Sequence, residues 1–239
     1  MTIATTTSID RRAAVEAFAV AAVVTGGVTL ASRVTLEHVA TVVGLIFLGA
    51  TWAMVWRRDD LIVEKSGLAF GGVILPGLLD RRRAARSFAR AAGWAALFSV
   101  LTFAPFYLGW RWWWHPNLKF SLEIHSLPFL NDAAGQLLMI ALPEEAFYRG
   151  YLQTRLDDAF GARWNIGGAM IGPSLFITSA IFALGHLATV HDPARLAVFF
   201  PSLVFGWLRA KTRGVGASVF FHASCNIFSE LLGRGFGLY

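Results

Sequence analysis

Long apolar stretches alternate with short polar or basic stretches along the whole chain. A transmembrane helix needs about 20 consecutive apolar residues, whereas a transmembrane β-barrel shows short segments of alternating polarity. The predicted membrane segments are Ala13–Leu30, Val39–Trp56, Ala91–Trp110, Asn131–Leu152, Pro173–Ala188, Leu196–Ala210 and Val215–Leu232. The pattern therefore predicts an all-α fold, a polytopic transmembrane helical bundle of about seven membrane helices.

The chain contains no Pro-rich or Ser-rich linker and no internal repeat, so we predict one integrated membrane domain. Residues 1–130 hold the first membrane helices, and residues 131–239 hold a helical core with several polar clusters. The stretch Leu68–Leu79 is rich in Gly and Pro. It is followed by a basic cluster that contains Arg81, Arg82, Arg83, Arg86 and Arg90. This arrangement predicts an interfacial segment anchored to anionic headgroups, with a re-entrant hairpin as the alternative.

Composition supports a membrane protein. Only 15% of the residues are charged and 56% are hydrophobic, whereas soluble domains have about 25% charged residues. The net charge of +6 comes from basic loops beside membrane segments, which set topology, so we predict no nucleic-acid partner. Most of the 21 Lys and Arg residues fall in loops on the inner side if the N-terminus is cytoplasmic and the C-terminus outside.

The fourth membrane segment carries an acidic pair and an arginine. Residues four apart share one face of an α-helix, so Glu145 can pair with Arg149. Glu144 is five residues from Arg149 and points in another direction, which leaves it free to act as a general base toward water. The alternative is a purely structural Glu–Arg pair that bridges helices. Ionisable groups at membrane depth are costly, which favours a functional role.

Two more clusters lie in later segments, each with two residues that share a helical face. In the fifth segment these are Phe182 and His186, and in the seventh they are His222 and Asn226. If segments four and five form an antiparallel hairpin, Glu144 and His186 lie at similar depth. The second pair can donate N–H groups to an oxyanion, or can instead join helices by hydrogen bonds.

A metal ion is an open alternative. Two histidines and a glutamate suit a divalent cation such as zinc, and the candidate ligands are Glu144, His186 and His222. The sequence lacks the His-Glu-x-x-His helix of zinc proteases, and with one cysteine it has no cysteine pair. The usual zinc-binding signatures are therefore absent, and no cofactor is certain. A nucleophile such as Ser224 or Cys225 would leave the paired carboxylates unexplained.

The three clusters, in this order, resemble the CPBP family of intramembrane proteases, which includes type II CAAX prenyl endopeptidases and bacteriocin-processing and immunity proteins. The family pattern is Glu-Glu-x-x-x-Arg, then Phe-x-x-x-His, then His-x-x-x-Asn or Asp. The matching positions here are Glu144, Glu145, Arg149, Phe182, His186, His222 and Asn226. The resemblance covers residues 131–232. The sequence is also similar to a myxosortase-like branch of the family, whose members trim C-terminal membrane sorting tails.

The resemblance implies an intramembrane endopeptidase that cleaves a membrane-anchored protein or peptide in a bacterial inner membrane. It assigns water activation to Glu144 with His186, and it assigns the oxyanion site to His222 and Asn226. The remaining matched residues, Glu145, Arg149 and Phe182, would be supporting residues. A non-catalytic membrane immunity or interaction protein of the same family is the main alternative. A transporter comes third, because the chain shows no inverted repeat.

Overall fold

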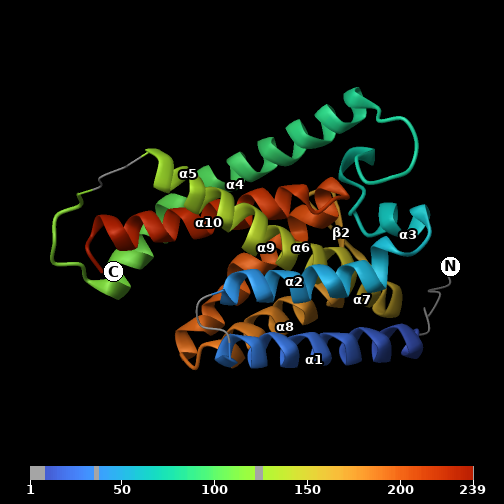
Figure 1. Ribbon diagram of the computed structural model, residues 1–239, viewed down its shortest axis with the longest axis horizontal. Helices are drawn as coiled ribbons and strands as arrows, with labels where there is room; N and C mark the ends of the chain where they lie inside the picture. The colour runs from blue at the N-terminus through green and yellow to red at the C-terminus, as the bar shows by residue number, and fades with distance from the viewer. Residues whose placement is uncertain (1–8, 35–37, 122–125, 239) are drawn as a thin grey trace, which may run out of the picture.

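The first two predicted membrane segments form an antiparallel pair of helices (Figure 1). The computed structural model describes residues 9–34, 38–121 and 126–238. Helix α1 spans Arg11–Val34, and α2 spans Val39–Thr51 and continues as the π-helix η1 (Trp52–Trp56). The buried face of α1 begins with Ala13, Ala17 and Ala21, spaced one turn apart. These small side chains let neighbouring helices approach closely, as is common between membrane helices.

The third membrane segment starts earlier than predicted. After α3 (Asp60–Lys65) and the 3-10 helix η2 (Phe70–Gly72), a single helix α4 runs over Arg81–Trp114. The predicted basic interfacial segment is thus the first turns of α4 and not a separate element. Its 34 residues span about 50 Å, more than the ~30 Å hydrocarbon core, so its basic turns extend beyond that core.

Asp80 explains why this helix begins among arginines. Its carboxylate accepts hydrogen bonds from the backbone N–H groups of Arg82 (2.9 Å) and Arg83 (3.0 Å). Such an N-cap satisfies donors that have no partner within the helix. The hydrogen bond from Arg83 is also the largest cause of the lowered pKa of Asp80. Hydrophobicity alone cannot detect this start, because the capping residue and the first turns are polar.

The fourth predicted segment lies within one long helical stretch that changes its winding several times. Two π-helical runs flank the acidic pair, and they alternate with three α-helical runs. In order these are α5 (Ser126–Gly135), η3 (Gln136–Ala141), α6 (Leu142–Glu145), η4 (Ala146–Gln153) and α7 (Thr154–Phe160). A π-helical turn is rare and is frequently found at functional sites. The sequence predicted a helix here but not its π-helical turns.

The remaining segments also form helices, and one unpredicted hairpin joins them. The turn between the fourth and fifth segments contains a β-hairpin, with Trp164 paired to Ile171. The elements are β1 (Trp164–Ile166), β2 (Ala169–Ile171), α8 (Pro173–Thr189), the 3-10 helix η5 (Pro193–Val198), α9 (Phe199–Thr212) and α10 (Gly216–Gly235). All seven predicted segments are therefore helical, and the strands are a small departure from the predicted all-α class.

Three helical stretches of the described chain are long and apolar enough to cross a membrane: Arg11–Val34, Val39–Trp56 and Arg81–Trp114. Helix α8 is apolar but shorter. The main core is built where α1, α2, η4, α8 and α10 meet, and it includes Phe147, Leu152 and Phe182. A second cluster joins α4 to α9 and α10. Residues on both sides of position 130 thus share one packed bundle.

Gly44 lets α2 pack against η3. A Cβ atom built on Gly44 would lie 2.7 Å from the backbone carbonyl oxygen of Met139, and a backbone atom cannot move aside cheaply. We expect Gly44→Ala to lower the free energy of unfolding by about 1–3 kcal/mol through overpacking. The matched control is Gly49→Ala in the same helix, where no heavy atom lies within 4 Å. Thermal unfolding in detergent should show loss for Gly44→Ala and no loss for Gly49→Ala.

Candidate active site

A cavity of about 450 Å³ brings together all four residues predicted to be catalytic. Glu144 comes from α6, His186 from α8, and His222 and Asn226 from α10. All four line this space, which we call the active-site cavity. These helices are far apart in sequence, so tertiary packing alone creates the group. Their convergence is the first observation that points to chemistry rather than to separate helix contacts.

Glu144 and Glu145 occupy opposite environments although they are adjacent. Successive helical residues are turned by about 100°, so the two carboxylates face different neighbours. Glu144 is half-buried and lines the active-site cavity. Its Oε2 atom is buried and receives no hydrogen bond from the described part of the protein. The Glu144 carboxylate therefore has acceptor capacity that the described part of the protein does not use.

Glu145 is fully buried and pairs with Arg149, as predicted from their spacing. Its Oε1 atom lies 3.2 Å from the Arg149 guanidinium and 3.0 Å from Nδ1 of His222. Arg149 also donates hydrogen bonds to Ser202, at 2.7 Å to the hydroxyl and 3.2 Å to the carbonyl. The guanidinium carbon lies 4.7 Å from the ring centroid of Phe182. Charge neutralisation and a cation–π contact together make this buried arginine tolerable.

His186 has a defined proton arrangement. Its Nδ1 atom lies 3.0 Å from the carbonyl oxygen of Phe182, one turn earlier in α8. A carbonyl oxygen only accepts hydrogen bonds, so Nδ1 must carry the proton. In the neutral ring Nε2 is then an acceptor. The ring centroid lies 4.4 Å from that of Phe182, which fixes the imidazole against an apolar wall. His186 therefore presents a proton acceptor from a fixed position.

His222 and Asn226 each use one donor within the protein. Because Glu145 is paired with Arg149, its carboxylate accepts the Nδ1–H of His222. The His222 ring also stacks on Phe205 with centroids 4.7 Å apart. Asn226 donates from Nδ2 to the side-chain oxygen of Gln136 at 3.0 Å. Asn226 keeps a second N–H, whereas Nε2 of His222 donates only if both ring nitrogens are protonated.

The comparisons with known proteins find a family model that matches part of the chain. Residues 126–228 match the family model described as type II CAAX prenyl endopeptidase Rce1-like. This region is Rce1-like. It begins with α5, ends within α10 and contains all seven residues of the three clusters. The Rce1-like family is a family of polytopic membrane proteases. Together with three helical stretches long and apolar enough to cross a membrane, the match indicates an integral membrane protein. No curated protein and no solved structure matches the chain.

Sequence reasoning missed a chain of polar residues that begins at the active-site cavity of the Rce1-like region. Gln136 and Glu230 both line the cavity, and Nε2 of Gln136 lies 3.5 Å from Oε2 of Glu230. Glu230 forms an ion pair with Arg234, which lies 3.1 Å from Asp132. A signal was present, because Asn226, Glu230 and Arg234 follow one another at intervals of four residues.

This chain fixes the direction of every amide in it. A carboxylate only accepts hydrogen bonds, so Gln136 must turn its NH₂ group toward Glu230. The side-chain oxygen of Gln136 then faces Asn226 and accepts a hydrogen bond from the Asn226 NH₂ group. The same Glu230 carboxylate pairs with Arg234. The Glu230 carboxylate thus orients the Gln136 amide, and Gln136 in turn makes the NH₂ group of Asn226 the donor.

The zinc alternative does not fit this arrangement. Within residues 9–34, 38–121 and 126–238, no three His, Cys, Asp or Glu side chains are grouped so that they could hold a metal ion. The trio considered from the sequence, Glu144, His186 and His222, is therefore not grouped closely enough in this structure to hold a metal ion. Nδ1 of His222 contacts Glu145, and Nδ1 of His186 contacts a carbonyl oxygen.

Proposed function

We propose that this protein is an intramembrane endopeptidase that uses Glu144 to activate water. One observation carries the proposal: Glu144, His186, His222 and Asn226 lie around a single cavity of about 450 Å³, although they come from three helical elements. The Rce1-like match supports protease activity. A cavity of this size accommodates a water molecule and an extended piece of polypeptide around one peptide bond.

We assign water activation to two of the acceptors that line the cavity. A water molecule has two O–H groups, and Glu144 and Nε2 of His186 each accept one. The oxygen lone pair is then free to attack the carbonyl carbon of the substrate. Glu144 takes one proton as the new C–O bond forms and later returns it to the leaving nitrogen. General base catalysis of this kind contributes about 10²–10⁴-fold in rate.

The oxyanion that forms during the attack requires donors on the opposite side. Asn226 supplies the N–H group that Gln136 does not use. His222 donates from Nε2 when both ring nitrogens are protonated, and Glu145 holds the ring in place through its Nδ1. Glu145, Arg149 and Phe182 act as supporting residues that hold the two histidines in place. Preorganised donors of this kind stabilise the transition state more than the substrate.

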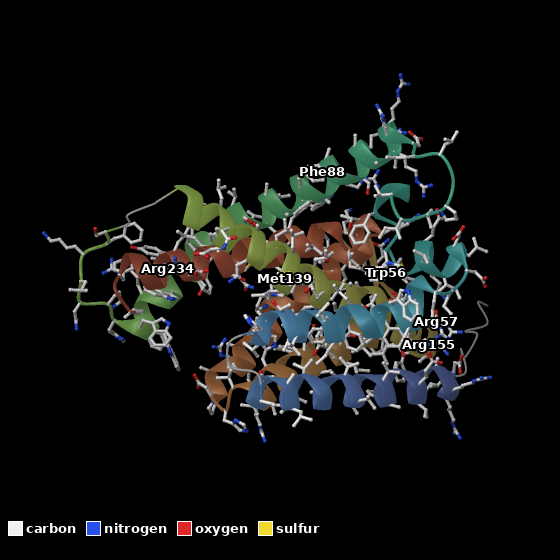
Figure 2. The ribbon with its side chains drawn as sticks, viewed as in Figure 1. Trp56, Arg57, Phe88, Met139, Arg155 and Arg234 are labelled. Carbon is white, nitrogen blue, oxygen red and sulfur yellow. The ribbon has the colours of Figure 1, made fainter. Side chains whose placement is uncertain are left out.

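The substrate we propose is a membrane-anchored protein that is trimmed near its C-terminus, as in the myxosortase-like branch. The proposed location is the bacterial inner membrane with a cytoplasmic N-terminus; residues 1–8 lie outside the described residues. Figure 2 shows Arg57 and Arg155 at one end of the bundle and Arg234 at the other. This separation agrees with the predicted inner and outer loops. It supports the proposed topology without naming the compartment at either end.

A reconstitution experiment tests the proposed activity. The purified full chain in liposomes is given membrane-anchored peptides with varied C-terminal tails, with and without a prenyl group. Mass spectrometry then detects new C-termini. We expect one discrete cleavage position per accepted peptide. If anchored peptides bind but no peptide in a broad set is cut, the protease proposal is wrong.

The polar chain behind Asn226 provides a second prediction. We expect Glu230→Gln to lower kcat about 3- to 10-fold with little change in KM, because a neutral amide no longer fixes the direction of the Gln136 amide. Gln136→Leu should have a similar effect by removing the acceptor of Asn226. The double variant should be no worse than either single variant. Additive losses would show that the two residues act separately.

Removal of metal provides a further prediction. Because the described residues contain no grouped metal ligands, we expect full activity after dialysis against a chelator that reaches the cavity. Metal content is measured on the same sample by atomic emission. Activity that disappears on chelation and returns with zinc would contradict the arrangement proposed for Glu144 and His186.

A further inference from the structure

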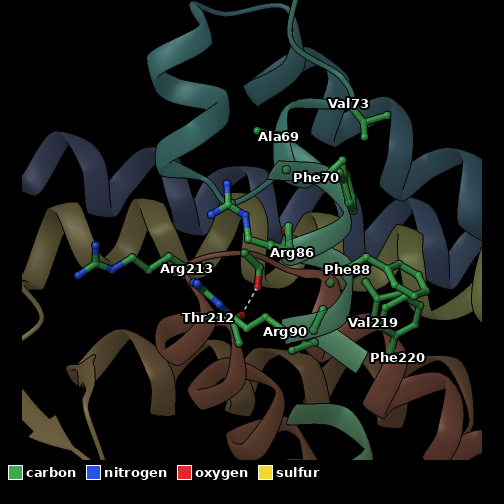
Figure 3. A pocket seen from close by; sticks show the side chains of 18 of the residues that line it. Ala69, Phe70, Val73, Arg86, Phe88, Arg90, Thr212, Arg213, Val219 and Phe220 are labelled. Carbon is green, nitrogen blue, oxygen red and sulfur yellow. Dashed lines mark hydrogen bonds between the residues drawn. The ribbon is translucent and has the colours of Figure 1, made fainter. Parts of the chain in front are cut away.

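A second cavity, of about 1010 Å³, lies beside the first turns of α4 (Figure 3). Its walls come from the α3–η2 region, the start of α4, the η3–α6 stretch and the turn between α9 and α10. No residue lines both this cavity and the active-site cavity. We call it the basic groove, because four arginines line it: Arg83, Arg86, Arg90 and Arg213.

Two of these arginines interact with nearby carboxylates, Arg83 with Glu64 and Arg86 with Asp80. Arg83 is neutralised by Glu64 at 2.7 Å, and Glu64 is the sole acidic residue of the lining. Arg86, Arg90 and Arg213 are exposed, and none has a direct ion-pair partner within the described residues. Figure 3 shows Arg86 and Arg90 of α4 and Arg213 of the turn before α10, with the Arg213 side chain directed away from the other two. The groove therefore presents a net positive charge to an anion.

The rest of the lining is apolar and open. Val73, Phe88 and Leu138 are 57%, 63% and 53% exposed, and all three line the groove. The rings of Phe88 and Phe220 meet edge to face with centroids 5.2 Å apart. Exposed apolar surface next to a cluster of cations suits a ligand with an anionic head and a hydrocarbon tail. A small inorganic anion could pair with the arginines but would leave the apolar side chains of the groove exposed to solvent.

We propose that the basic groove binds one anionic phospholipid. Helix α4 is longer than the hydrocarbon core, so its basic first turns lie at the level of the headgroups. The phosphate would contact Arg86 and Arg90, because guanidinium groups pair well with phosphate oxygens, and Arg213 adds positive charge to the same groove. One acyl chain would lie along Phe88, Phe220 and Leu138. The bound lipid would brace α4 against the start of α10, independently of the proposed peptidase activity.

Lipid binding to the intact purified protein tests this proposal. The Arg86→Gln, Arg90→Gln and Arg213→Gln triple variant is compared with a matched control that loses three charges outside the groove: Arg57→Gln, Arg58→Gln and Arg81→Gln. Affinity for phosphatidylglycerol and phosphatidylcholine is measured by native mass spectrometry. We expect the groove variant to bind phosphatidylglycerol about ten-fold or more weakly than the control, with no difference for phosphatidylcholine.

A steric variant separates the groove from general charge effects. Ala85 is exposed and lines the groove, so Ala85→Trp should fill the space while all the arginines remain. We expect it to weaken phosphatidylglycerol binding as the triple variant does. Equal affinity in the groove and control variants would overturn the proposal. So would competition by inorganic phosphate, by glycerol phosphate or by an acidic peptide at concentrations similar to that of the lipid.

Discussion

Replacing Glu144 with glutamine is expected to lower the rate of peptide cleavage about 10²–10⁴-fold while the protein still inserts and folds. The amide keeps the size of the side chain but cannot accept a proton. Glu144 is half-buried at the active-site cavity, and its Oε2 atom has no partner in the described protein, so the substitution breaks no internal hydrogen bond there. Cleavage of an anchored peptide is measured in liposomes, and the unfolding temperature in detergent.

Two control variants sharpen this prediction. Glu64→Gln also removes one carboxylate, but Glu64 lies in the basic groove, so cleavage should continue at the wild-type rate. Cys225 lines the active-site cavity and is the remaining candidate nucleophile, so Cys225→Ala should stay active. A Glu144→Gln protein with normal cleavage would remove the proposed base. If the chain never cleaves a peptide and this variant keeps its biological effect, the non-catalytic immunity or interaction role is favoured instead.

Replacing Arg149 with methionine is expected to lower the free energy of unfolding by about 3–5 kcal/mol. Both side chains of the Glu145–Arg149 pair are 0% exposed, so the variant leaves a buried carboxylate with only His222 beside it. It also removes the hydrogen bonds to Ser202 and the contact with Phe182. Unfolding is followed in detergent by circular dichroism or by a thermal shift.

A double variant distinguishes the charge from the packing. In Glu145→Leu with Arg149→Met, no unpaired charge remains, so we expect most of the lost stability to return. Activity should not return, because His222 loses the acceptor that orients its ring. The exposed pair Arg83 and Glu64 is the matched control, and Arg83→Met should change the stability by less than about 1 kcal/mol. An equal loss of unfolding free energy at the buried and at the exposed pair would contradict the argument that burial makes the Glu145–Arg149 pair important.

The helical segments were predictable because a bilayer selects for long apolar runs, and all seven predicted segments are helical. The pairing of Glu145 with Arg149 was predictable because it depends only on the spacing within one helix. The start of α4 was not, because it depends on a polar cap at Asp80 rather than on hydrophobicity. The β-hairpin at Trp164–Ile171 was not predicted either, since a few short-range backbone pairs specify it.

The sequence alone determined which ionisable side chains lie within apolar segments and which of them share a helical face, because both follow from residue type and a period of 3.6. Only the tertiary structure decided how these faces meet. It placed Glu145 against His222, made Glu144 the carboxylate that lines the cavity, and added Gln136 and Glu230 behind Asn226. Such contacts join residues up to 94 positions apart, and their geometry depends on helix packing that no local pattern encodes.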